Sequence, residues 1–189
     1  MAQGERLEDA AAFAGVRDGF ERLWTPHRMA YIRGEKPTPD DRGECPFCTA
    51  PQRDDEEGLI VHRGRRCYVV LNLFPYNPGH LLVCPYRHVP LYVDLDAEEL
   101  AEFSDLTRQA LRALERASNP AGFNIGMNQG AVAGAGLAAH LHQHIVPRWG
   151  GDMNFLPIVG RTKALPMLLA DVREQLVEAW PDEDAPPDR

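Results

Sequence analysis

Two short apolar runs, at residues 66–72 and 80–84, constrain the fold of this 189-residue chain more strongly than any other feature. Both runs are rich in β-branched residues, which favour strands. The segment between them, Phe74-Pro-Tyr-Asn-Pro-Gly79, has the composition of a turn. The pattern therefore predicts a β-hairpin.

The stretch that follows is typical of a long amphipathic helix. Asp96 is a good N-cap residue, residues 97–117 carry apolar positions at helical spacing, and Asn119-Pro120 ends the pattern. We expect large apolar side chains to form its buried face. These are Leu100, Phe103, Leu106, Leu111 and Leu114.

Two more strands are predicted in the second half of the chain. They span residues 122–128 and residues 140–148, and a loop of small residues at 130–136 separates them. The order of hairpin, helix, strand and strand is typical of an α+β fold with an antiparallel sheet.

The segments toward the two ends are less regular. Helical spacing of apolar residues predicts a helix within 9–33 and a final helix at 163–179, whereas 34–58 is rich in Pro, Gly and charge. The polar stretch from Pro181 onward is predicted to be a disordered tail. The resulting division is an N-terminal helical extension, a domain that holds the candidate sites, a C-terminal helix and the tail. Their ranges are 1–40, 41–160, 161–180 and 181–189.

Composition excludes several classes of protein. The formal net charge is −8 and the isoelectric point about 5.3, which argues against a broad nucleic-acid surface. No apolar run approaches the roughly 18 residues of a membrane span. The first residues lack the layout of a secretion signal. We therefore expect a cytoplasmic protein that binds neither nucleic acid nor membrane.

Three histidines alternate with other residues in His140-Leu-His142-Gln-His144. In an extended strand, residues two apart point to the same face, so these imidazoles would form one row. Such a row can coordinate a metal, attack an electrophile or hold an anion.

Cysteine usage suggests a metal or redox site within 34–58. Cys45 and Cys48 have a spacing that zinc sites favour, whereas Cys67 and Cys84 lie in apolar runs and are predicted to be buried. The other two zinc ligands could come from any of the seven histidines or from these two cysteines. Zinc contributes on the order of 10–16 kcal/mol in small metal modules, enough to anchor this segment. A redox pair and two unlinked thiols are the alternatives.

Several motifs together resemble the histidine triad (HIT) superfamily. They are the alternating histidines with the following Ile145-Val146, Asn77-Pro-Gly-His80-Leu-Leu-Val83, Tyr86-Arg-His88-Val89, and Asn124-Ile-Gly-Met-Asn-Gln-Gly130. The resemblance covers roughly residues 45–150. Leu23–Met29 and Pro147–Phe155 are further similar to the branch that contains the actinobacterial diadenosine tetraphosphate phosphorylases.

The resemblance implies a HIT-like fold, with an antiparallel sheet of about five strands, a long central helix and helical extensions at both ends. It also implies a metal site. In zinc-bearing bacterial members the ligands are the Cys pair, a His after the hairpin and the first His of the triad. Here these are Cys45, Cys48, His88 and His140. A structural Zn²⁺ is therefore the expected cofactor.

The resemblance further assigns catalytic and substrate-binding residues. His142 would be the nucleophile that forms a nucleotidyl-histidine intermediate, and His144 would stabilise the phosphoryl oxygens. Asn72 would hold ribose and Asn128 a phosphate oxygen, with Gln129 as the alternative to Asn128.

Two further positions are candidates for substrate contact. Gly136 belongs to the small-residue loop, which lets the backbone approach phosphates closely. Gln143 replaces the apolar residue that is usual in the family. Its side chain should either find a partner on the face opposite the histidines or reach the substrate.

The predicted function is that of a nucleotidyl transferase or phosphorylase that cleaves dinucleoside polyphosphates. The substrate would be an adenine nucleotide and the acceptor inorganic phosphate. A hydrolase of dinucleoside polyphosphates or nucleoside phosphoramidates, with water as the acceptor, is the first alternative, and a non-catalytic nucleotide-binding module is the second. A homodimer or homotetramer is expected.

Overall fold

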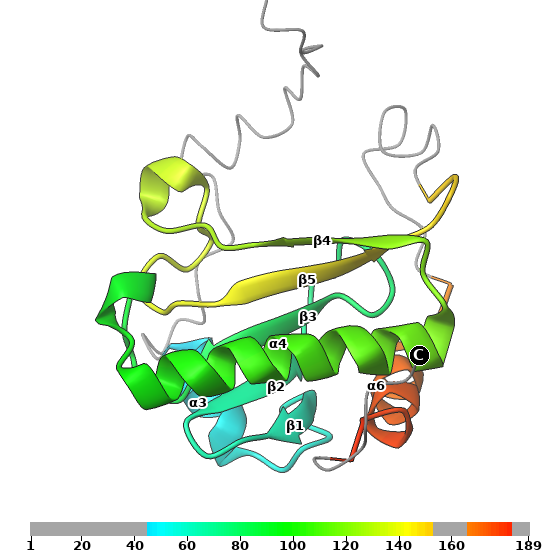
Figure 1. Ribbon diagram of the computed structural model, residues 1–189, viewed down its shortest axis with the longest axis horizontal. Helices are drawn as coiled ribbons and strands as arrows, with labels where there is room; N and C mark the ends of the chain where they lie inside the picture. The colour runs from blue at the N-terminus through cyan, green and yellow to red at the C-terminus, as the bar shows by residue number, and fades with distance from the viewer. Residues whose placement is uncertain (1–44, 153–165, 183–189) are drawn as a thin grey trace, which may run out of the picture. The chain divides into compact units, whose positions relative to one another are not determined.

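The computed structural model describes residues 45–152 and 166–182, all within the compact unit Thr38–Arg189. Its described strands form one sheet of five, in the order β1-β2-β3-β5-β4, and each neighbouring pair is antiparallel (Figure 1). The predicted α+β class and antiparallel sheet are confirmed. The strands are β1 (Ile60–Arg63), β2 (Cys67–Leu71), β3 (Leu81–Pro85), β4 (Gly122–Gly126) and β5 (Gln143–Arg148).

The predicted hairpin is β2 and β3, whose register runs from Cys67 opposite Pro85 to Leu71 opposite Leu81. Both strands are buried throughout, as their apolar sequences require. The turn between them needs the glycine at position 79. Its φ is 79°, and a Cβ there would lie 2.9 Å from Leu114 Cδ2.

The long helix, α4 (Ala97–Ser118), begins and ends as predicted, to within one residue. The Asp96 side chain accepts hydrogen bonds from the backbone N–H groups of Glu98 and Glu99, and Glu99 accepts from Asp96 N in return. At the other end Asn119 adopts the left-handed conformation, with φ 43°.

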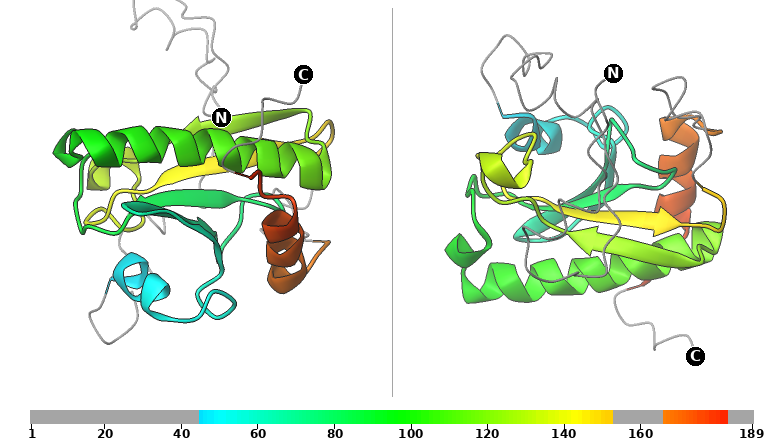
Figure 2. Two further views of the ribbon diagram at one scale, coloured as in Figure 1. Left: turned by 60° about the horizontal axis from the view of Figure 1, so that its bottom comes forward. Right: turned by 90° about the horizontal axis from the view of Figure 1, so that it is seen from above.

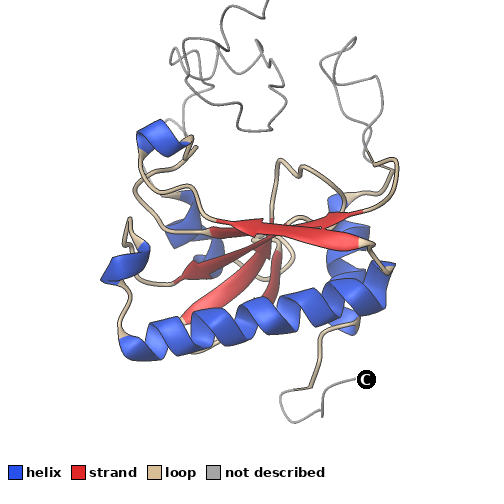
Figure 3. Cartoon of the chain, turned by 45° about the horizontal axis from the view of Figure 1, so that its top comes forward, coloured by secondary structure: helices blue, strands red, loops and turns tan. Residues whose placement is uncertain are grey.

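Helix α4 covers one face of the sheet, and the core lies between them (Figure 3). Phe103, Leu106 and Leu114 are buried and Leu111 is partly buried, as predicted, but Leu100 is 37% exposed. The buried stripe passes through Glu99 instead, because Arg87 neutralises that carboxylate. Apolar spacing alone could not show this partner.

Two shorter helices remain in the described part of the chain (Figure 2). One lies on the face of the sheet opposite α4, and the other lies beside the edge strand β1. Helix α3 (Pro46–Thr49), followed by a 3₁₀ turn at Ala50–Gln52, packs with Phe47 and Ala50 on the face opposite α4. Helix α6 (Leu169–Glu178) corresponds to the predicted C-terminal helix and packs against β1 and α4. It begins at Leu169 rather than at 163, because residues 166–168 are not helical and Leu168 is extended.

Some strands also differ from the sequence predictions. Strand β1 was not predicted, because it has only four residues and a bulge between Ile60 and His62. Strand β4 ends at Gly126 rather than at 128. Strand β5 begins at Gln143 rather than at 140, so only the last histidine of the three lies in a strand. Short 3₁₀ turns occupy Tyr92–Asp94 and, inside the expected loop, Ala131–Ala133.

The predicted helix at 9–33 and the tail from 183 lie outside the described residues, so the division of the chain into segments stays a prediction. Within 45–152 and 166–182, no helix combines the length and the apolarity that crossing a bilayer demands.

Candidate active site and metal site

Cys45, Cys48, His88 and His140 come together at one end of the sheet, and their ligand atoms all lie within 4.8 Å of one another. Nδ1 of His140 is 3.4 Å from Sγ of both cysteines, and Nδ1 of His88 is 3.2 Å from Cys48 Sγ. These are the four residues that the family resemblance indicated.

The two sulfurs are adjacent because of the local fold of residues 45–49, called here the Cys turn. Pro46 starts helix α3, and the backbone N–H groups of Cys48 and Thr49 both donate to the Cys45 carbonyl. This single helical turn places both Sγ atoms beside His140. The hydroxyl of buried Tyr68 donates to the Phe47 carbonyl over 2.7 Å and fastens the turn to β2.

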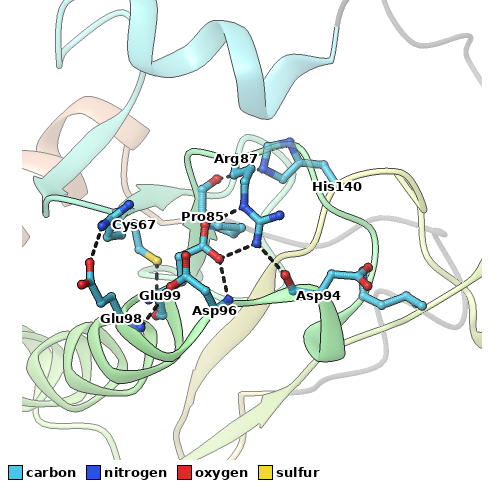
Figure 4. Close-up of polar contacts among 10 residues, drawn as sticks. Cys67, Pro85, Arg87, Asp94, Asp96, Glu98, Glu99 and His140 are labelled. Atoms are coloured by element: carbon cyan, nitrogen blue, oxygen red, sulfur yellow. Dashed lines mark hydrogen bonds and ion pairs between the residues drawn. The ribbon is translucent and has the colours of Figure 1, made fainter.

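The segment after β3 is fastened to the start of α4 (Figure 4). Arg87 donates to both carboxylate oxygens of buried Glu99, at 2.9 and 2.6 Å, and to the Asp94 carbonyl at 2.5 Å. The Arg87 guanidinium lowers the pKa of Glu99, so this carboxylate stays charged. The neighbouring His88 is thereby held at the cluster.

The hydrogen-bond partner of His140 fixes which of its nitrogens is available. Its Nε2 lies 2.9 Å from the Pro85 carbonyl (Figure 4), which can only accept, so Nε2 carries the proton. The Nδ1 lone pair therefore faces the thiols, as a metal ligand must. Two sulfurs and two imidazole nitrogens are the donor set of a tetrahedral zinc site. Burial and then the neighbouring Cys45 raise the pKa of Cys48 to about 11, so a thiolate at Cys48 would need a cation beside it.

The middle histidine has the opposite tautomer. Nδ1 of His142 lies 2.8 Å from the His140 carbonyl, so Nδ1 carries the proton and Nε2 keeps a lone pair. Burial lowers the pKa of His142 below its usual value, which keeps the ring neutral. A neutral imidazole with a free nitrogen is a competent nucleophile.

The third histidine is oriented by His80, which was predicted only as one of several possible zinc ligands. His80 Nδ1 accepts from the Tyr76 N–H at 3.0 Å, so its Nε2 donates to His144 Nδ1 at 2.9 Å. His144 Nε2 then carries the proton. Burial, followed by the neighbouring His142, lowers the pKa of His144 to about 4, so this ring is a neutral donor.

A cavity of about 440 Å³ opens beside His144, between the hairpin turn and strands β4 and β5. One wall is rigid. Arg148 pairs with Asp152 through Nε at 2.5 Å and donates to Asn124 Oδ1 at 2.7 Å, while Asn77 donates to Asp152 at 2.7 Å. The polar lining consists of Tyr76, Asn77, Asn124, Asn128, His144 and Arg148.

The predicted substrate-binding residues do not all line this cavity. Asn128 does, whereas the side-chain oxygen of Gln129 accepts from the Tyr92 N–H at 2.8 Å, which favours Asn128 of the two. Asn72 lies beside His80, with 3.2 Å between its Nδ2 and His80 Nδ1. Gly136 is exposed in the loop before the histidines.

The side chain of Gln143 has a partner on helix α4. Its side chain is buried and donates to Thr107 Oγ1 of α4 at 3.2 Å. Strand alternation puts His144 on the face away from α4 and therefore Gln143 toward it. This contact favours a partner on the face opposite the histidines over a contact with the substrate.

Asn124 and Arg148 were not predicted to line the cavity. Arg148 and Asp152 do have the spacing of a possible ion pair, but nothing in the linear sequence indicates that Asn124 lies beside them.

The fold and these motifs define the class of protein. The family model for the HIT domain matches residues 53–151, and the chain belongs to this family. Among its relatives, an AP-4-A phosphorylase of Mycobacterium tuberculosis is 50% identical over 171 residues, which cover 88% of this chain and 87% of that protein.

Solved structures share the fold. A hypothetical histidine triad nucleotide-binding protein of Sulfolobus tokodaii aligns with a TM-score of 0.60 and 28% identity, over 71% of this chain and 91% of that one. A Zn-bound histidine triad family protein of Mycobacterium smegmatis aligns with a TM-score of 0.57 and 23% identity, over 72% and 92%.

Proposed function

We propose that this protein is a dinucleoside polyphosphate phosphorylase that splits diadenosine tetraphosphate-like substrates with inorganic phosphate. The observation that carries the proposal is the pair of tautomers: His142 presents a free nitrogen lone pair beside an imidazole, His144, that presents an N–H. The AP-4-A phosphorylase, similar over 87% of its length, supports the choice of reaction and substrate.

The first step forms the intermediate. His142 Nε2 attacks the α-phosphorus, the P–N bond forms, and the bond from phosphorus to the bridging oxygen breaks with release of a nucleoside triphosphate. The Nε2–H of His144 donates to a phosphoryl oxygen as its charge develops, together with backbone N–H groups nearby. The His140 carbonyl, which accepts from His142 Nδ1, stabilises the positive charge that the ring gains.

The second step returns the enzyme to its starting state. An oxygen of inorganic phosphate attacks the same phosphorus, the P–N bond breaks, and a nucleoside diphosphate leaves. His142 recovers its neutral form with the proton still on Nδ1. The net reaction converts diadenosine tetraphosphate and phosphate into ATP and ADP.

We also propose that the Cys45, Cys48, His88 and His140 cluster binds a structural Zn²⁺. The cation would stabilise the thiolates and join the Cys turn to the segments before β5 and after β3. Zinc binding contributes on the order of 10–16 kcal/mol in small metal modules, so such a site can anchor a segment that buries few apolar side chains of its own. The cation would take part in neither chemical step.

For the substrate, we assign ribose to Asn72 and a phosphate oxygen to Asn128, which lines the cavity. Gln129, whose side chain is held by Tyr92, is the weaker candidate for the phosphate contact. The backbone around Gly136 would approach the phosphates.

We further propose a cytoplasmic homodimer, with a homotetramer as the larger alternative. Four cysteines without disulfides suit a reducing compartment. Among the described strands, β4 lies at one of the two edges of the sheet, and its Ile125 is 49% exposed, which favours pairing with a second copy.

The test is incubation of the purified protein with diadenosine tetraphosphate, with and without inorganic phosphate. Phosphate-dependent appearance of ADP plus ATP is expected. Phosphate-independent AMP plus ATP would identify a hydrolase instead, and nucleotide binding with no turnover would identify a binding module.

A further inference from the structure

The side chain of Phe47, in the turn between the two cysteines, contacts the middle histidine as well as the first. Its ring centroid lies 4.8 Å from that of His142, with a 44° tilt between the planes, and 5.7 Å from that of His140, nearly edge-on. Phe47 was not predicted to have a role. A residue whose only task was to separate two metal ligands would not need to contact the nucleophile.

His142 is held from several directions. Its Nδ1 is fixed by the His140 carbonyl, His144 packs edge-on at 5.0 Å, and Phe47 packs against the ring. His142 as a whole is only 6% exposed. The hydrogen bond alone leaves the imidazole free to swing about it. The two packed rings remove that freedom and thereby fix the direction of the Nε2 lone pair.

Phe47 is itself well anchored. Its carbonyl accepts from the hydroxyl of Tyr68, a residue with no exposed surface in the middle of the sheet. The turn is therefore attached to β2 through the backbone of Phe47, independently of the sulfurs. The ring of Phe47 consequently has a fixed position from which to orient His142.

We propose that Phe47 is a positioning residue that holds the His142 ring in line for attack on the α-phosphorus. This inference rests on the proposed function. A small error in the direction of attack is costly, because a misplacement of about 1 Å can reduce a rate about 100-fold. Phe47 should therefore act on the chemical step rather than on substrate affinity.

The experiment compares Phe47→Ala and Phe47→Leu with the wild type, using the zinc-loaded full chain. It measures bound zinc, KM for diadenosine tetraphosphate, and the single-turnover rate at which AMP becomes attached to the protein without added phosphate. Pro46→Ala is the matched control, because Pro46 lies in the same turn, is exposed and forms no ring contact with His142.

For Phe47→Ala we expect the attachment rate to fall about 10- to 100-fold, with KM within about 3-fold and full zinc binding. Phe47→Leu, which keeps the apolar bulk, should recover most of the rate, and Pro46→Ala should stay within about 2-fold of the wild type.

Two results would overturn the inference: an unchanged rate in a zinc-loaded Phe47→Ala protein, or a rate loss in both Phe47 variants that follows loss of zinc. A wild-type protein that never acquires AMP would instead refute the proposed function, so the two failures are distinguishable.

Discussion

The two ends of the histidine triad make different use of the same side chain. At one end His140 donates through Nε2 to a carbonyl and turns Nδ1 toward two thiols. At the other end His144 accepts at Nδ1 from His80 and turns an Nε2–H toward a cavity. The difference lies in the neighbour of each ring, because a carbonyl demands a donor and a His80 Nε2–H demands an acceptor.

The comparison shows that the partner of each imidazole, rather than its place in the motif, decides its chemistry. The metal end depends on contacts from α3 and from the segment after β3. The cavity end depends on the hairpin turn. Variants at the two ends should therefore have separable effects on zinc content and on rate.

Cys48→Ala should have the largest effect, because it removes one ligand from the metal end. We expect loss of zinc and, with it, a loss of about 4 kcal/mol or more in the free energy of unfolding, equivalent to a melting temperature lower by about 10 °C or more. Metal analysis and thermal unfolding measure this. Cys84→Ala is the control, since Cys84 is buried and outside the cluster, and it should retain zinc. Full zinc retention by Cys48→Ala would exclude the assigned ligand set.

His80→Phe should affect only the cavity end. Without the Nε2–H of His80, His144 can carry its proton on Nδ1 and lose its donor toward the substrate. We expect kcat to fall about 10- to 100-fold with zinc content unchanged. His62→Ala is a suitable control, because His62 stacks on Trp180 and belongs to neither end. Steady-state kinetics and metal analysis measure both quantities. A normal kcat for His80→Phe would refute the role of His80 in placing the His144 proton on Nε2.

The pH dependence of stability gives a smaller signal from the same end. The pKa of His144 is about 4 in the folded protein, lowered first by burial, against about 6.5 in an unfolded chain. Below about pH 6.5 the unfolded state therefore binds a proton that the folded state does not, so stability falls until about pH 4.

His144→Gln should make that slope shallower by up to about 1 kcal/mol per pH unit, since one proton per molecule is removed from the balance. Urea denaturation at constant zinc concentration between about pH 4.5 and 6.5 measures the difference. Identical slopes in the two proteins would show that His144 does not titrate as described.

Gln143→Leu should have the smallest effect, because Gln143 points at α4 and belongs to neither end. We expect kcat and KM within about 2-fold of the wild type and a change in the free energy of unfolding of about 1 kcal/mol or less. The same kinetic and urea measurements apply. A large increase in KM would mean that Gln143 reaches the substrate after all.

Much of the fold could be predicted from sequence because local signals agree there. The hairpin has two buried runs around a turn, and α4 has a strong N-cap and an end at Asn119. Strand β1 escaped prediction because four residues with a bulge have no clear period. Leu100 was misplaced because burial of Glu99 depends on Arg87, a contact made only in three dimensions.

The site divides in the same way. The spacing of the cysteines and of the three histidines indicated candidate ligands and catalytic residues. The family resemblance then identified His88, among the other histidines, as the remaining ligand. The tautomers could not be predicted, since they depend on the Pro85 and His140 carbonyls and on His80. The roles of Asn124 and Phe47 could not be predicted either, because they depend on the residues that pack beside them.

The most direct test of His142 as the nucleophile is to identify the residue that becomes attached to the nucleotide. The protein is mixed with diadenosine tetraphosphate without phosphate, quenched in alkali to preserve the phosphorus–nitrogen bond, digested and analysed by mass spectrometry. We predict AMP on His142, and no adduct or turnover in His142→Ala. An adduct on another residue, or an active His142→Ala protein, would contradict the account.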